Sequence, residues 1–139
     1  MTPTVRKRGS AVCFHDGKFL VVWLRDPATG QVYPFPPGGK IEIGETPAEA
    51  SRREALEETG YQLLIDETRF RVLRYQFEWG GQTYDCETHF FKATLVRLPP
   101  IPPTPDPFRL KVEWITTPVF ESAFQFHDGI KQSCLDLRD

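Results

Sequence analysis

The feature that most constrains this chain is the segment 39–61, in which acidic residues recur at helical spacing. Glu54, Glu57 and Glu58 stand at positions i, i+3 and i+4, so their side chains share one face of a helix. Like charges on one face repel each other and cost stability unless a cation lies among them. Carboxylate oxygens suit a hard cation such as Mg²⁺, which keeps several waters and bridges to substrate phosphates. The segment therefore predicts a magnesium site for a phosphate-bearing ligand, with a solvated acidic helix face as the alternative.

Start and stop signals bound the predicted helix. Thr46 precedes Pro47, which places a capping hydroxyl before a proline at the first helical position. Glu49 lies three residues after Thr46, as a capping box requires, and Gly60 supplies a left-handed residue at the other end. The preceding segment 35–40 is too rich in proline and glycine for regular structure. Its glycines would let the backbone approach a metal or a phosphate.

Residues 39–61 resemble the Nudix box, the signature of the Nudix hydrolases. That signature asks for Gly, five residues, Glu, seven residues, Arg-Glu, an aliphatic residue, any residue, Glu-Glu, any residue, Gly, and an aliphatic or similar residue. The chain supplies its polar and glycine positions with Gly39, Glu45, Arg53, Glu54, Glu57, Glu58 and Gly60. Ala55 and Tyr61 are softer fits at the apolar positions. The resemblance implies the α/β Nudix fold, a mixed β-sheet sandwiched between α-helices, with the motif helix on one side.

The resemblance also implies roles for the acidic residues. Glu57 and Glu58 are the expected primary metal ligands, and Glu54 either joins them or accepts a proton from the attacking water. The carbonyl of Gly38 is implicated as a further ligand. An all-oxygen site favours Mg²⁺, with Mn²⁺ as a substitute.

Two cationic residues lie near these acids in the sequence. Arg53 is expected to point to a different helix face from the ligands and to hold Glu45, which would fix the loop against the helix. The alternative is a solvent-facing ion pair worth little. Lys40 either touches a substrate phosphate or is a plain surface charge.

The predicted reaction is cleavage of a pyrophosphate linkage in a nucleoside diphosphate-X substrate by metal-activated water. Glu54 is the predicted general base, and the candidates outside the motif are Glu87, Asp106 and Glu113. Asp106 gains weight because its proline-rich loop precedes the last predicted strand, where a substrate-facing loop is plausible. The alternative function is a catalytically silent Nudix-fold module that senses a nucleotide. Such modules usually lose the carboxylates that are present here.

Aromatic residues are the candidates for stacking on a base. They are Tyr33, Phe35, Tyr75, Phe77, Trp79, Tyr84, Phe90 and Phe91. Alternation places Tyr75, Phe77 and Trp79 on one strand face, for which core packing is the plainer interpretation. Tyr75 is kept as a candidate substrate contact. The resemblance implies ADP-ribose where a proline follows the box at this distance, and dinucleoside polyphosphates where a tyrosine lies slightly further on. No proline stands there and Tyr75 falls slightly early, so neither substrate is supported. Nucleoside triphosphates such as 8-oxo-dGTP, nucleotide sugars and RNA 5′ ends stay open as well.

Composition and charge bound the class of protein. A chain of 139 residues with 40% hydrophobic and 26% charged content fits one globular domain, taken as residues 1–139. A net charge of −2 and a pI near 5.9 give no global positive field, so no DNA partner is expected. The basic cluster 6–8 leaves an RNA 5′ end open, although such clusters are more often solvated termini.

Three widely spaced cysteines, Cys13, Cys86 and Cys134, have no paired metal spacing. They indicate reduced thiols and a cytoplasmic protein. We find neither a signal-peptide pattern nor a run of the roughly 20 apolar residues that a membrane span needs. A homodimer stays open.

The remaining pattern alternates strands and helices. The expected strands are 9–15, 19–24, 61–65, 69–79, 82–96 and 112–115, with hairpin turns at Asp16-Gly17 and Gly80-Gly81. A helical region over 119–137 is expected to break near Gly129. Residues 25–31 form a turn-rich loop. Pro99 to Pro107 contain six prolines and predict an extended loop, which could also serve as a ligand for an SH3-like partner.

Overall fold

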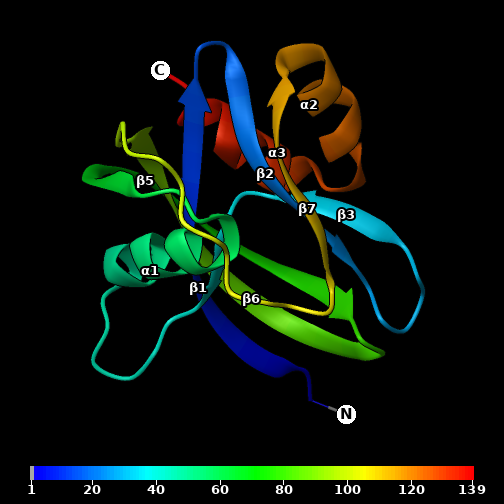
Figure 1. Cartoon of the computed structure of the whole chain (residues 1–139). Helices are drawn as coiled ribbons and strands as arrows, with labels where there is room; N and C mark the ends of the chain where they lie inside the picture. Colours follow the sequence, from blue (N-terminus) through cyan, green and yellow to red (C-terminus); the bar gives the residue numbers. More distant parts are fainter. Residues whose placement is uncertain (1) are drawn as a thin grey trace.

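The computed structural model describes residues 2–139 as a mixed sheet with helices on both sides (Figure 1). In chain order the elements are β1 (Thr4–His15), β2 (Lys18–Arg25), β3 (Val32–Phe35), β4 (Gly38–Lys40), α1 (Pro47–Thr59), β5 (Leu63–Trp79), β6 (Gln82–Leu95), β7 (Arg109–Thr116), α2 (Thr117–Ala123), a 3₁₀ turn η1 (Phe124–Phe126) and α3 (Asp128–Asp136). The α/β class expected from the sequence is confirmed.

Strand β1 organises the sheet because it pairs with three other strands. Near its end it pairs antiparallel with β2, where Phe14 and His15 face Phe19 and Lys18. Over most of its length it pairs parallel with β6, and over residues 8–10 it pairs antiparallel with β4. The path through the sheet is β3-β2-β1-β6-β5, with β7 beside β2. β2 and β4 therefore lie along the edge of β1 opposite β6.

Alternation along β1 sorts its side chains into two cores. Ala11 and Cys13 face helix α1 and pack with Ala55, whereas Val12 packs in the core beneath α2, η1 and α3. At Gly9 the backbones touch, since a Cβ there would lie 2.4 Å from the carbonyl oxygen of Pro47. Glycine at this position lets α1 lie directly against the sheet.

Two expectations about strands need correction. Residues 38–40 are not irregular but form the short strand β4, because Gly39 pairs with Gly9 of β1. The segments 61–65 and 69–79 are not separate strands, since β5 runs through both. The pairing of β5 with β6 shifts register between Asp66 and Phe70, and this irregularity is what divided the sequence pattern. The hairpin at Gly80-Gly81 is confirmed, with φ values of 60° and 80°.

The C-terminal helical region breaks at His127, earlier than expected at Gly129. His127 is extended, with φ −154° and ψ 103°, and its Nδ1 accepts the N–H of Ile130 at 3.1 Å. Sequence pattern suggested the glycine because glycine is a common helix breaker, but here a capping histidine starts α3.

The proline-rich segment is an irregular loop, as expected, and it is anchored to the end of α1. The N–H of Ile101 donates to Gly60 at 2.9 Å, and the N–H of Thr104 donates to the carbonyl of Glu57 at 2.7 Å. These bonds satisfy carbonyls that the helix end leaves without partners.

The three cysteines are buried free thiols, which agrees with the expected reduced state. Within residues 2–139 no helix is both long and apolar enough to cross a membrane.

Candidate active site between the acidic helix and strand β4

The helix that carries the acidic residues begins and ends where the sequence predicts. Thr46 Oγ1 accepts the N–H of Glu49 at 3.1 Å, and Glu49 Oε1 accepts the N–H of Thr46 at 2.9 Å, which completes the capping box. Gly60 closes the helix in the left-handed conformation with φ 78°. These local signals set where α1 begins and where it ends.

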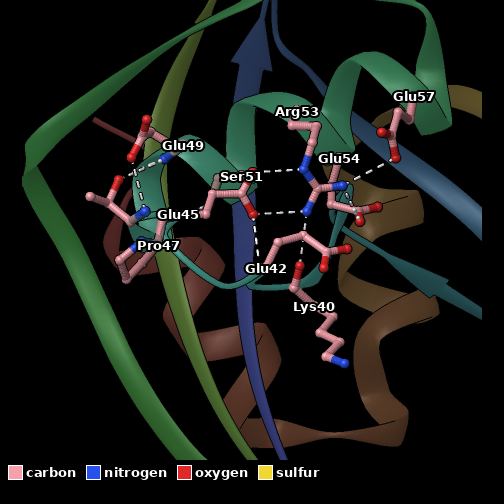
Figure 2. A network of polar contacts seen from close by, with 10 residues as sticks. Lys40, Glu42, Glu45, Pro47, Glu49, Ser51, Arg53, Glu54 and Glu57 are labelled. Carbon is pink, nitrogen blue, oxygen red and sulfur yellow. Dashed lines mark hydrogen bonds and ion pairs between the residues drawn. The ribbon is translucent and has the colours of Figure 1, made fainter.

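Arg53 ties this helix to the loop before it (Figure 2). Its Nε and Nη2 donate to the two carboxylate oxygens of Glu45 at 2.7 and 2.9 Å, and Nη2 also donates to the carbonyl of Lys40 at 2.9 Å. The predicted contact between Arg53 and Glu45 is therefore present. Hydrogen bonding from Arg53 lowers the pKa of Glu45 to about 2, so this carboxylate is charged at neutral pH.

The expected orientation of Arg53 away from the ligand acids is wrong. Its Nη1 donates to Glu54 at 2.9 Å and to Glu57 at 3.3 Å, because the long side chain folds back across the helix surface (Figure 2). The guanidinium thus offsets the repulsion between these carboxylates in this structure.

Glu58 turns the other way, toward strand β4. Its Oε1 accepts the N–H of Gly38 at 2.8 Å. Burial raises the pKa of Glu58 to about 8, and the neighbouring charge of Glu54 contributes in the same direction. A desolvated carboxylate with one neutral donor is poorly compensated, and a cation beside it would offset that cost.

The N–H and the carbonyl of Gly38 both point away from β1, to the side where Glu58 lies. In β4, the flanking carbonyl of Pro37 and N–H of Ile41 bond to β1. Since the N–H and C=O of one residue in an antiparallel strand point to the same edge, the carbonyl of Gly38 lies on the side of its N–H, away from β1. It is positioned to serve as an oxygen donor beside Glu58.

Gly39 must be a glycine because β4 and α1 approach each other closely at this residue. A Cβ at Gly39 would lie 2.5 Å from the carboxyl carbon of Glu54. Burial raises the pKa of Glu54, although hydrogen bonding and charge from Arg53 oppose this shift. The side chain of Lys40, by contrast, is exposed and points away from the carboxylates (Figure 2).

The predicted donors converge at the angle between β4 and α1, but their carboxylates are turned to Arg53 and Gly38. Within the described residues 2–139, no group of three or more His, Cys, Asp or Glu side chains is arranged to hold a metal ion. The donor set is nevertheless all oxygen, three carboxylates and one backbone carbonyl, and it includes the desolvated Glu58. That chemistry fits a hard divalent cation.

An aromatic cavity of about 160 Å³ is lined in part by Ser10, the residue of β1 that pairs with Gly38 of β4. Its aromatic lining consists of Phe35, Tyr75, Phe77, Trp79, Tyr84 and Phe90. Phe90 is buried, as core packing requires, whereas Tyr75, Phe77 and Trp79 are half-buried and present their rings to the cavity. The core interpretation of that stripe was therefore incomplete. Tyr75 is held in place by a hydrogen bond of 2.9 Å between its hydroxyl and Thr88.

Of the three acids outside the helix, Asp106 alone lines this cavity. Its Oδ1 accepts the N–H of Phe108 at 2.8 Å, and its charge helps to raise the pKa of Glu58. Glu87 is paired with Arg74 at 2.7 Å. Glu113 accepts the indole N–H of Trp23 at 3.1 Å. The latter two are occupied elsewhere in the fold.

Arg6 and Arg8 are site residues that the sequence interpretation missed. The basic cluster looked like a solvated terminus, but β1 begins at Thr4 and extends through it. In a strand, alternate side chains share a face, so Arg6 and Arg8 both line the cavity while Lys7 does not. The sequence signal for this role was the spacing of Arg6 and Arg8, two residues apart, directly before the apolar part of the predicted strand.

With this geometry established, comparison with known proteins places the chain in a family. A model of the NUDIX domain matches residues 5–131. The chain belongs to the NUDIX domain family, and the resemblance of residues 39–61 to the Nudix box is confirmed.

Relatives with solved structures include several hydrolases. A NUDIX hydrolase from Nitrosomonas europaea is 25% identical, with a TM-score of 0.76 over 97% of this chain and 88% of that one. An Ap4A hydrolase from C. elegans is 19% identical, with a TM-score of 0.68 over 94% and 93% of the two chains; at this identity the likeness concerns the fold.

A sequence relative is the oxidized purine nucleoside triphosphate hydrolase of Danio rerio. It is 43% identical over 56 residues, which cover 40% of this chain and 34% of that protein. The match thus spans about a third of the relative's length, and what that protein hydrolyses does not transfer directly to this chain.

Proposed function

We propose that the protein is a divalent-metal-dependent pyrophosphohydrolase that cleaves the phosphoanhydride linkage of a nucleoside diphosphate-X substrate. Membership of the NUDIX domain family and the hydrolase names of its relatives support the hydrolase class. The observation that carries the proposal is the approach of α1 to the glycines of β4. Glu58 accepts the N–H of Gly38, Glu54 lies against Gly39, and Glu57 shares their helix face.

Glu54, Glu57, Glu58 and the carbonyl of Gly38 would hold the metal, for which we propose Mg²⁺ with Mn²⁺ as a substitute. Such a cation supplies charge that offsets the negative phosphate oxygens and lowers the pKa of a coordinated water. The donor set suits this task because it contains only oxygen.

The residues of the chain would position and activate the reactants. Glu54 is the proposed general base, since its burial against Gly39 raises its pKa toward the range in which a carboxylate accepts a proton well. Arg53 and Glu45 would hold the loop against α1, so that Glu54 keeps its place. Asp106, at the cavity wall, is the alternative base.

The aromatic cavity supports a substrate that carries a planar base. We propose a nucleotide as the small-molecule substrate, with nucleoside triphosphates, oxidized purine forms included, as the first class to test because of the Danio rerio relative. Three buried thiols without disulfides support a reducing compartment such as the cytoplasm.

A nucleotide panel assayed with Mg²⁺ tests the function. Nucleoside triphosphates, ADP-ribose, nucleotide sugars, dinucleoside polyphosphates and triphosphorylated RNA should be compared for cleavage of the phosphoanhydride linkage, with both phosphorylated products identified by chromatography. Glu57→Gln serves as the inactive reference, and Glu67→Gln, an exposed acid on β5 outside the site, serves as the matched control. Tight nucleotide binding without turnover by the unaltered chain would favour the sensor alternative and overturn the enzyme.

A further inference from the structure

Two arginines on β1 line the aromatic cavity without an acidic partner. Arg6 and Arg8 both contribute to its wall, and both side chains are half-buried. Among residues 2–139, no carboxylate forms an ion pair with either guanidinium. Other arginine and lysine side chains of the described chain do pair with acids: Arg53, Arg71, Arg74, Lys111 and Lys131. Partly desolvated cations of this kind gain most from an anionic ligand.

Arg6 is held at the cavity by an aromatic side chain. Its guanidinium carbon lies 3.9 Å from the centre of the Tyr84 ring, within range of a cation–π contact. Such a contact orients the planar group but leaves its N–H donors without acceptors. The donors of Arg6 are therefore available to a ligand that enters the cavity.

Arg8 lies between the cavity and the acidic helix. It is two residues further along the same strand face, and its charge acts on both Glu54 and Glu58. Arg8 lines the aromatic cavity and also pairs with Lys40 of β4, the strand that contacts Glu54 and Glu58. The charges of the two arginines also exceed that of Asp106, the acid on the cavity wall.

We propose that Arg6 and Arg8 form an anion subsite that binds the phosphate next to the nucleoside while the aromatic cavity holds the base. This inference rests on the proposed function, because it assigns the orientation of the substrate in the same site. The base lies among the aromatic rings, the adjoining phosphate contacts the arginines, and the more distant phosphates reach the helix acids. Guanidinium groups suit this position because their paired N–H donors match the geometry of phosphate oxygens.

The neighbouring Lys7 provides a matched control. It carries the same charge one position away, but it faces the other side of the strand, is exposed and does not line the cavity. If only the overall positive charge matters, Lys7→Gln and Arg8→Gln should weaken anion binding equally. If the subsite exists, only Arg8→Gln should weaken it.

Binding of nucleoside monophosphates in excess chelator tests the subsite without any metal or turnover. Isothermal titration should compare AMP and GMP with adenosine and guanosine, using the unaltered chain, Arg6→Gln, Arg8→Gln and Lys7→Gln. Arg8→Gln should weaken monophosphate binding at least about tenfold, the effect of one lost charge-assisted contact. It should leave nucleoside binding unchanged, and Lys7→Gln should match the unaltered chain.

Arg8→Lys adds a variant that preserves charge without the forked donors, and it should restore only part of the affinity. Monophosphate binding that ignores both arginines, or that is absent from the unaltered chain at millimolar concentration, overturns the subsite. Subsite binding without hydrolysis of any nucleotide overturns the proposed function but leaves the subsite in place. Hydrolysis whose KM is the same in Arg8→Gln overturns the subsite but leaves the function.

Discussion

At the scale of single residues, Arg53 and its acidic neighbours explain how a like-charged helix face is tolerated without a cation. Arg53 bridges Glu45, Glu54 and Glu57, while Glu58 turns to the N–H of Gly38. Each carboxylate therefore has a donor, but Glu58 remains buried with a strongly raised pKa. A divalent cation could replace these contacts of the carboxylates with Arg53 and Gly38.

Glu57→Gln and Glu58→Gln should each reduce turnover by orders of magnitude, because each removes the charge of a proposed ligand and keeps the shape. In chelator, Glu58→Gln should also raise the unfolding temperature, since it relieves the cost of a buried, poorly compensated carboxyl. Glu57 is more exposed and paired with Arg53, so Glu57→Gln should leave that temperature nearly unchanged. Steady-state kinetics and thermal unfolding check both parts, and near-normal turnover in both variants would contradict the assignment.

The general base is tested by comparing Glu54 with the acid on the cavity wall. If Glu54 is the base, Glu54→Gln should depress the rate strongly and flatten the acid limb of the pH–rate profile, whereas Asp106→Asn should act modestly. Glu113→Gln is the control, because Glu113 is occupied by Trp23. An Asp106→Asn enzyme with a collapsed rate, a lost acid limb and unchanged Mg²⁺ binding would transfer the role to Asp106.

At the scale of elements, the short strand β4 and helix α1 form the site because glycines let them approach. Gly9 brings α1 against β1, and Gly39 leaves space for the carboxyl group of Glu54. The proline-rich loop, which carries Asp106, is anchored to the C-terminal end of α1 through bonds to Gly60 and Glu57. Close backbone contact, rather than any single side chain, sets how near Glu54 and Glu58 lie to β4.

Gly39→Ala should therefore impair activity more than stability. The added Cβ meets the far end of the flexible Glu54 side chain, which can move aside at little cost to folding but then leaves its position. We expect a large fall in kcat with an unfolding temperature close to that of the unaltered chain. Lys40→Ala, an exposed neighbour in the same strand, is the control. Equal activity of the two variants would show that the position of Glu54 is not critical.

The cap of helix α3 should make stability depend on pH near neutrality. Nδ1 of His127 accepts the N–H of Ile130, and burial lowers the pKa of His127 below its usual 6.5. The unfolded chain then binds a proton at higher pH than the folded chain, so the free energy of unfolding falls as pH drops through about 6.5 toward the folded pKa. Denaturant unfolding at pH 8 and pH 5.5 measures this loss.

His127→Asn is the matched variant for that prediction. Asparagine also caps helices but does not titrate, so the part of the pH dependence that comes from this cap should disappear. A variant with the same pH dependence as the unaltered chain would assign the effect to other groups.

At the scale of the whole molecule, the pairing of β1 with β4 and β6 and the anchoring of one loop bring three remote segments together. They are the N-terminal end of β1, the acidic helix and the proline-rich loop (Figure 1). The proposed metal ligands carry like charges that repel one another. Metal binding should therefore raise the stability of the whole fold.

Activity should vanish in excess chelator and return with Mg²⁺ or Mn²⁺. The same ions should raise the unfolding temperature, since a ligand of the native state at a hundred times its dissociation constant adds about 2.7 kcal/mol to stability. Glu57→Gln should weaken this shift, while Glu67→Gln should retain it. Turnover undiminished in excess chelator would contradict a metal-dependent site.

The sequence by itself determined the helix ends, the hairpin turn and the shared face of the acidic residues, because these depend on local interactions. The capping box at Thr46, the left-handed Gly60, the hairpin at Gly80-Gly81 and the shared face of Glu54, Glu57 and Glu58 depend on residues close together in the chain. Local spacing defines these features, so they could be predicted before any contact was known.

Tertiary structure decided everything that depends on distant segments. Strand β4 forms because Gly39 pairs with Gly9, and Arg6 and Arg8 become cavity residues because β1 extends beside β6. Asp106 reaches the cavity because its loop is anchored to α1. No local pattern encodes these pairings, since each arises from burial and hydrogen bonding between segments far apart in sequence.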